Sequence, residues 1–97
     1  MYALMLVRYR RPLPEVEAVT ESHRAYLRTL QDRGLLLASG PLDPRHGGVL
    51  LLRVQDAQPL ADLDAIRDND PFFQAGLATY EPLVWNVGLG REALDRL

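Results

Sequence analysis

Residues 35–54, LLLASGPLDPRHGGVLLLRV, decide how the chain folds. Two short apolar runs, Leu35–Ser39 and Val49–Val54, are separated by a segment rich in residues that form turns. Apolar runs of this length, bounded by such a segment, are typical of β-strands. The stretch therefore predicts two strands that pair as a hairpin with a rather long loop.

A helix is expected on each side of this hairpin. Before it, apolar residues recur at helical spacing over residues 16–30, and Pro14 suits the first turn of such a helix. After it, Pro59 opens a second helix. That helix must end before Pro71, because the residue that precedes a proline is pushed out of the helical region.

Two further strands, Tyr2–Tyr9 and Ala78–Val87, enclose these elements. Pro82 has no N–H to donate to a sheet, so the last strand is expected at an edge or with a bulge. A short helical turn is expected at residues 72–77 and an amphipathic tail at 89–97. The order β-α-β-β-α-β predicts an α+β, ferredoxin-like fold, a four-stranded antiparallel sheet with two helices on one face. The 97 residues are expected to form a single domain.

The first strand is apolar on both faces. Leu4 and Leu6 alternate with Met5 and Val7, whereas a sheet with one face in water alternates apolar with polar residues. Two helices can cover only one face, and monomers rarely expose several hundred Å² of contiguous apolar surface. We therefore expect a homodimer in which two sheets pack face to face.

The composition excludes several classes of protein. The chain has no cysteine, which rules out a disulfide scaffold, a thiolate metal site and a thiol nucleophile. A net charge of −2 disfavours a nucleic-acid partner, and no apolar run is long enough to enter a membrane. A cytoplasmic location is the default expectation. No metal or cofactor is expected, because the two histidines are distant from each other and no ligand spacing accompanies them.

All eleven basic residues are arginine and none is lysine. This reflects either a genome-wide coding bias or the recognition of anions, because the guanidinium group binds carboxylates and phosphates bidentately. The absence of lysine also removes Schiff-base chemistry from the options.

Three positions are candidates for chemistry. His23 lies within the apolar stripe of the first helix, where it is either a hydrogen-bonded core residue or a functional imidazole. Asp70 precedes Pro71 and suits a helix cap, and a capping carboxylate keeps a free oxygen for a second role. Ser39-Gly40-Pro41 is either a plain strand end or a place where a hydroxyl and an accessible backbone meet a ligand.

Several segments together resemble the YciI-like (YCII-related) proteins over roughly residues 1 to 90. They are the opening strand that ends in Arg8-Tyr9, the segments His23–Leu27 and Leu35–Pro41, and the sequence Asp70-Pro71-Phe72. The resemblance implies the dimeric α+β barrel form of the ferredoxin-like fold. It also implies a site with a histidine from the first helix and an aspartate from the segment after the second, which here are His23 and Asp70. The wider superfamily includes muconolactone isomerases and a chlorinated-hydroquinone dehydrochlorinase.

These features favour an enzyme that uses His23 and Asp70 as a general acid–base pair on a small substrate. A partly buried imidazole beside a carboxylate suits proton transfer, and without an activated nucleophile the natural reactions are isomerisation or elimination, as in a lyase or dehydrochlorinase. The residues expected to bind the ligand are Arg8, Tyr9, Ser39, Gly40, Pro41, Phe72 and Phe73. Each aromatic residue has core or dimer packing as its alternative role, which is favoured for Trp85. The alternative function is a non-catalytic homodimer that binds a metabolite or assists another protein.

Overall fold

Four strands form one antiparallel sheet in the order β2-β3-β1-β4, so the predicted ferredoxin-like fold is confirmed. The computed structural model describes residues 1–97. The strands are β1 (Tyr2–Tyr9), β2 (Leu36–Pro41), β3 (Gly47–Arg53) and β4 (Ala78–Trp85). The helices are α1 (Leu13–Asp32), α2 (Pro59–Asp68), α3 (Pro71–Gln74) and α4 (Arg91–Asp95). The expectation that the strand with Pro82 lies at an edge is confirmed, because β4 pairs only with β1.

The hairpin loop is shorter than the sequence predicted, because β2 extends to Pro41 and β3 begins at Gly47. The turn-forming glycines here are part of the sheet. A Cβ at Gly47 would lie 2.0 Å from the Val7 carbonyl oxygen, so only glycine lets this end of β3 approach β1. Pairing of β3 with β1 therefore continues to the pair Gly47 and Arg8.

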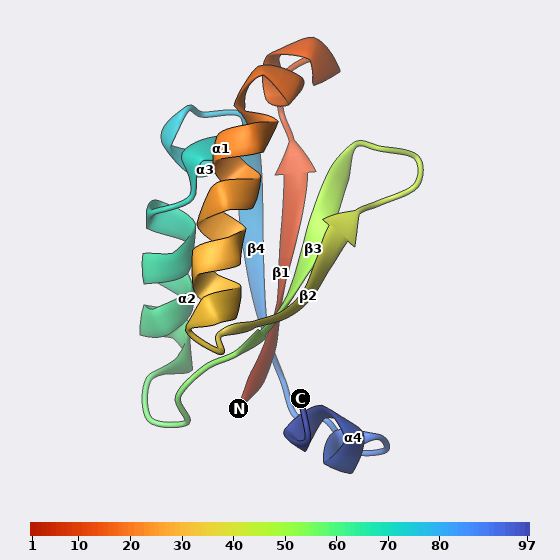
Figure 1. Ribbon diagram of the computed structural model, residues 1–97, viewed down its shortest axis with the longest axis vertical. Helices are drawn as coiled ribbons and strands as arrows, with labels where there is room; N and C mark the ends of the chain where they lie inside the picture. The colour runs from red at the N-terminus through yellow and green to blue at the C-terminus, as the bar shows by residue number, and fades with distance from the viewer.

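The helices α1, α2 and α3 lie on one face of the sheet, and their apolar side chains bury that face (Figure 1). Strand alternation directs every second residue of β1 and β3 into this layer. The core residues that are less than 4% exposed include Ala3, Met5, Val7, Val16, Leu30, Leu50, Leu52, Leu63 and Phe72. This layer between α1 and the sheet also contains the candidate site.

The other face of the sheet carries no helix over most of its area (Figure 1). Its apolar side chains come from three neighbouring strands: Leu4, Leu6, Val49, Leu51, Leu83 and Trp85. Trp85 is 42% exposed, so it is not part of the core of one chain. We call these six residues the open face.

The C-terminal tail is held against the sheet end where the N-terminus also lies (Figure 1). The Tyr2 hydroxyl donates to Asp95 at 2.5 Å, and the Arg53 guanidinium donates to the Leu94 carbonyl at 2.8 Å. None of the helices combines the length and the apolar character that crossing a membrane requires.

Candidate functional site

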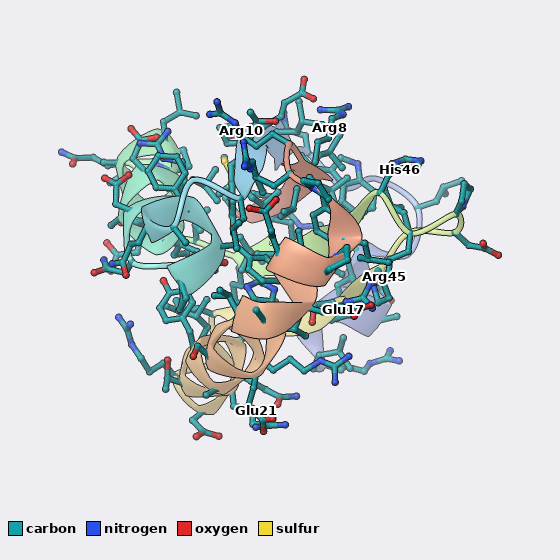
Figure 2. The ribbon with its side chains drawn as sticks, turned by 90° about the horizontal axis from the view of Figure 1, so that it is seen from above. Arg8, Arg10, Glu17, Glu21, Arg45 and His46 are labelled. Atoms are coloured by element: carbon teal, nitrogen blue, oxygen red, sulfur yellow. The ribbon has the colours of Figure 1, made fainter.

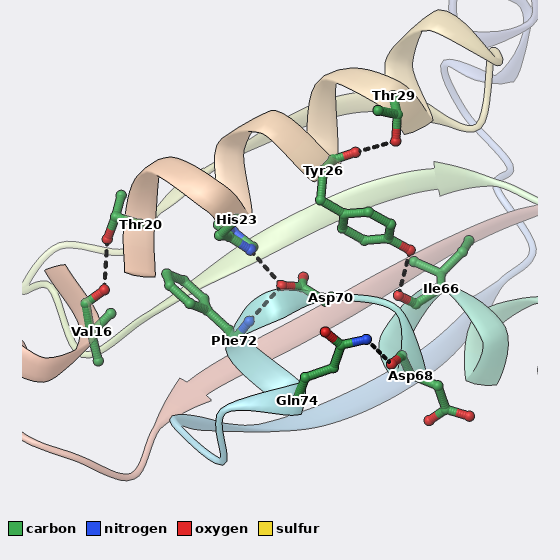
Figure 3. Close-up of polar contacts among 10 residues, drawn as sticks. All are labelled: Val16, Thr20, His23, Tyr26, Thr29, Ile66, Asp68, Asp70, Phe72 and Gln74. Carbon is green, nitrogen blue, oxygen red and sulfur yellow. Dashed lines mark hydrogen bonds and ion pairs between the residues drawn. The ribbon is translucent and has the colours of Figure 1, made fainter. Parts of the chain in front are cut away.

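His23 and Asp70, which are 47 residues apart in sequence, form a hydrogen bond (Figure 3). The distance between His23 Nδ1 and Asp70 Oδ1 is 2.7 Å. The histidine projects from α1, and the aspartate stands at the start of α3, which packs against α1. The His23 side chain is 12% exposed and that of Asp70 is 0% exposed, so water competes little for this contact.

Asp70 is positioned by the local sequence. Because Pro71 follows it, Asp70 adopts an extended conformation, and its side chain caps α3 by accepting the Phe72 N–H at 3.0 Å. The second contact of the carboxylate, with His23, is made by the same oxygen as the cap. Oδ1 accepts both the cap and the His23 contact, whereas Oδ2 is buried without a hydrogen-bond partner.

The imidazole of His23 is oriented by two contacts. An ionised carboxylate only accepts hydrogen bonds, so the contact with Asp70 places a proton on Nδ1 and leaves Nε2 for a ligand. The Phe72 ring stacks on the imidazole with centroids 3.9 Å apart and planes at 8°. This geometry resembles the base and its orienting group in hydrolase triads, without the nucleophile.

Two tyrosines surround the buried carboxylate. The Tyr80 hydroxyl is buried without a partner, and its pKa is raised first by burial and then by the negative charge of Asp70. The Tyr26 hydroxyl donates to the Ile66 carbonyl at 2.7 Å (Figure 3). Burial and then the charge of Asp70 raise the pKa of Tyr26 to about 12, and Arg33 opposes them. Both phenols therefore stay neutral near pH 7. Neither tyrosine was predicted to belong to the site, although strand alternation places Tyr80 on the same face of the sheet as Ala78.

A cavity of about 200 Å³ opens beside His23, between α1 and the sheet. Its wall includes six residues that the sequence analysis selected: Tyr9, His23, Ser39, Gly40, Pro41 and Phe72. It also includes residues that were not selected, notably Arg24, Arg45, Thr20 and Gly48. Gly48 pairs with Val7 and Pro41, and a Cβ at this position would lie 2.9 Å from the Gly40 carbonyl oxygen. Asp70 lies behind the imidazole and does not line the cavity.

Arg8 and Phe73 lie away from the cavity, unlike the sequence-based expectation. Val7 and Tyr9 face the helices, so alternation turns Arg8 to the opposite face (Figure 2). There Arg8 pairs with Glu81 at 2.7 Å. Phe73 follows Phe72 on α3, but its ring packs edge-to-face against Tyr80. The Arg67 Cζ atom lies over the Phe73 ring, 5.0 Å from its centroid.

The comparisons with known proteins agree with this architecture. No curated protein matches the chain. Among solved structures, the 5-chloro-2-hydroxyhydroquinone dehydrochlorinase TftG from Burkholderia phenoliruptrix AC1100, in complex with 2,5-dihydroxybenzoquinone, is similar with a TM-score of 0.75. The identity is 23%, over 91% of this chain and 96% of that chain, which shows a shared fold. The model of the YCII-related domain matches residues 1–86. The chain therefore belongs to the YCII-related family.

Proposed function

We propose that the protein is a small-molecule enzyme in which His23 acts as general base and acid and Asp70 orients it. The observation that carries this proposal is the 2.7 Å contact between His23 Nδ1 and Asp70 Oδ1 at the wall of a cavity. The contact leaves Nε2 free to exchange a proton with a bound molecule, and the buried carboxylate stabilises the imidazolium that forms.

The pair of His23 and Asp70 suits reactions in which one proton moves and no covalent intermediate with the protein forms. In an elimination, Nε2 takes a proton from the substrate, the released electron pair forms a double bond, and the leaving group departs with its own bonding pair. In an isomerisation, the imidazolium returns the proton to a different atom of the same molecule. Neither reaction needs a nucleophile, and the chain has no cysteine to supply one.

The cavity suits a molecule with one ring. A cavity of about 150 Å³ is enough to hold benzene in a protein core, and this one measures about 200 Å³. The stacked His23 and Phe72 rings offer a flat apolar wall. TftG, which shares the fold, is a dehydrochlorinase of a hydroxylated chlorobenzene and was solved with a quinone. We therefore propose substituted six-membered rings as the first substrates to test.

The experiment is a turnover assay with 5-chloro-2-hydroxyhydroquinone, other hydroxylated halobenzenes and unsaturated lactones. Released halide is measured by ion chromatography, and bond rearrangement or deuterium uptake is measured by proton NMR in D₂O. We expect turnover of at least one compound, and a fall of about 100-fold or more in kcat in both His23→Gln and Asp70→Asn. His46→Gln is the matched control, because His46 is an exposed histidine that does not line the cavity.

Two results would contradict the proposal. One is turnover that survives in His23→Gln at the level of the control variant. The other is saturable, stoichiometric binding of these compounds without any turnover, which instead supports the non-catalytic binding protein.

We also propose that the working unit is a homodimer joined through the open face. The observation behind this is the open face, where no helix of the same chain lies over the sheet and where Leu83 and Trp85 are exposed. A second copy offers the same patch, and a two-fold axis would place the two patches against each other. Burying apolar area of this kind is the main driving force of association.

Light scattering after size exclusion tests the dimer. We expect twice the 10.9 kDa chain mass for the wild type and the chain mass itself for Leu83→Arg. Gln31→Arg, an exposed position on the helical side, is the control and should remain dimeric. A wild type that is monomeric at micromolar concentration would refute the interface.

A further inference from the structure

The charged side chains that line the cavity are basic. Arg24 from α1 and Arg45 from the hairpin loop both contribute to its wall, whereas no aspartate or glutamate does. The chain as a whole has a net charge of −2, so this local excess of positive charge is not a general property of the surface. A concave site lined by one sign of charge attracts molecules of the opposite sign.

These two arginines are not committed to partners within the chain. Arg24 forms no ion pair, and Arg45 Nη1 lies 3.9 Å from Glu17 Oε1, at the outer limit of such a contact (Figure 2). Elsewhere in the chain, Arg8 and Arg67 hold carboxylates at 2.7 and 2.9 Å. A guanidinium group without a close partner keeps its paired N–H donors for a carboxylate or another planar anion.

Further donors lie on the same wall. The hydroxyl groups of Ser39 and Tyr9 both belong to lining residues and form no hydrogen bond with the rest of the chain. The Phe72 ring, which stacks on the imidazole of His23, belongs to the apolar part of the wall together with Val7, Leu27 and Leu50. A ligand that satisfies the whole wall therefore combines a flat ring with a negatively charged substituent.

We propose that the cavity recognises a one-ring anion, whose carboxylate or phenolate is held by Arg24 and Arg45 while the ring lies against His23. The proposal extends the proposed function and rests on it, because it assumes that the cavity is the substrate site. Recognition and catalysis are nevertheless assigned to different residues, so they are separable by experiment. Glu17 and Glu21 do not line this cavity. They line a neighbouring surface depression together with the outer sides of Arg24 and Arg45, so the anion competes there only with the long 3.9 Å contact between Glu17 and Arg45 (Figure 2).

The test compares benzoate with benzamide, which has the same shape and no charge. Binding to the intact protein is followed by chemical-shift changes in ¹H–¹⁵N NMR spectra, with variants Arg24→Gln and Arg45→Gln. We expect benzoate to bind at least about tenfold more tightly than benzamide, and each variant to lose about tenfold in benzoate affinity. Arg28→Gln is the matched control, because Arg28 lies one turn further along α1 and outside the cavity.

Each outcome of this binding experiment either supports or overturns the inference. Equal affinity for benzoate and benzamide, no binding of either, or the same benzoate affinity in Arg24→Gln, Arg45→Gln and Arg28→Gln would overturn the inference. Preferential benzoate binding that depends on both arginines, in a protein that turns over none of the compounds in the assay above, would support the inference and remove the catalytic proposal. Turnover of neutral ring compounds, together with equal affinity for benzoate and benzamide, would support the catalytic proposal and overturn the inference.

Discussion

Replacing Asp70 with alanine should destabilise the fold far more than the loss of one carboxylate on the surface. Asp70 Oδ1 caps α3 through the Phe72 N–H at 3.0 Å and accepts from His23 at 2.7 Å. The side chain is completely buried, so water cannot replace it at either donor. The substitution thus removes one helix cap and leaves one imidazole N–H without an acceptor.

The expected magnitude follows from these two losses. A lost N-cap costs about 1 kcal/mol, and an unpaired buried donor costs roughly 1–3 kcal/mol. Together the free energy of unfolding should fall by about 2–4 kcal/mol, a large part of the stability of a domain of this size. At roughly 4–8 °C per kcal/mol, the melting temperature should fall by about 10–30 °C.

Thermal unfolding followed by circular dichroism measures this effect. Asp70→Asn keeps an acceptor at the Oδ1 position and should cost only about 1 kcal/mol, because it loses the charge and not the hydrogen bonds. Asp64→Ala is the surface control, since the Asp64 side chain is 54% exposed and its ion pair is with Arg67, at 3.4 Å. If Asp70→Ala melts within a few degrees of Asp64→Ala, Asp70 does not hold α1 and α3 together and the reasoning fails.

Three further outcomes are expected. Gly47→Ala should lower the free energy of unfolding by about 3 kcal/mol or more in urea titration, because the added Cβ would lie 2.0 Å from the Val7 carbonyl oxygen. Gly40→Ala is the control and should leave the free energy of unfolding nearly unchanged, because a Cβ at Gly40 would have no atom within 4 Å. The stability advantage of the wild type over Tyr26→Phe should hold up to pH 10 and shrink toward pH 12. The reason is that the pKa of Tyr26 in the folded protein, about 12, lies above the ordinary tyrosine value of 10.0, so the unfolded chain ionises first. A stability advantage that does not change with pH would refute this, and no lysine titrates in that range to obscure it. Arg53→Ala should raise hydrogen exchange in residues 88–97, because Arg53 holds the tail through the Leu94 carbonyl; unchanged exchange there would show that other contacts hold α4.

Much of the fold could be predicted from local patterns. The strand Tyr2–Tyr9 has the bounds that the sequence predicted, because charge and proline follow a short apolar run. The two helices begin near the prolines that suit a first turn, and Pro82 correctly placed β4 at an edge. The hairpin loop was less predictable, because Gly47 was interpreted as a turn residue, and only the close approach of β1 explains it as part of a strand.

The candidate site was only partly predictable. His23 and Asp70 were each selected from their local context, but only the resemblance to a family paired them, since no local pattern joins two residues that are 47 positions apart. Arg8 was expected to bind the ligand, yet alternation along β1 turns it away from the cavity. The arginines that do line it come from a helix and a loop, and their sequence context resembles that of any exposed arginine.

The sequence by itself determined the order of the elements, the apolar character of both sheet faces and the chemistry available, with arginine as its only strong base and no thiol. These properties depend on residue type and on spacing over a few positions, which any part of the chain carries locally. Only the tertiary structure decided that one oxygen of Asp70 serves both a helix cap and His23, and that Arg24 and Arg45 share a cavity wall. The physical reason is that these contacts join α1, α3 and the hairpin loop, which meet only when the helices pack on the sheet.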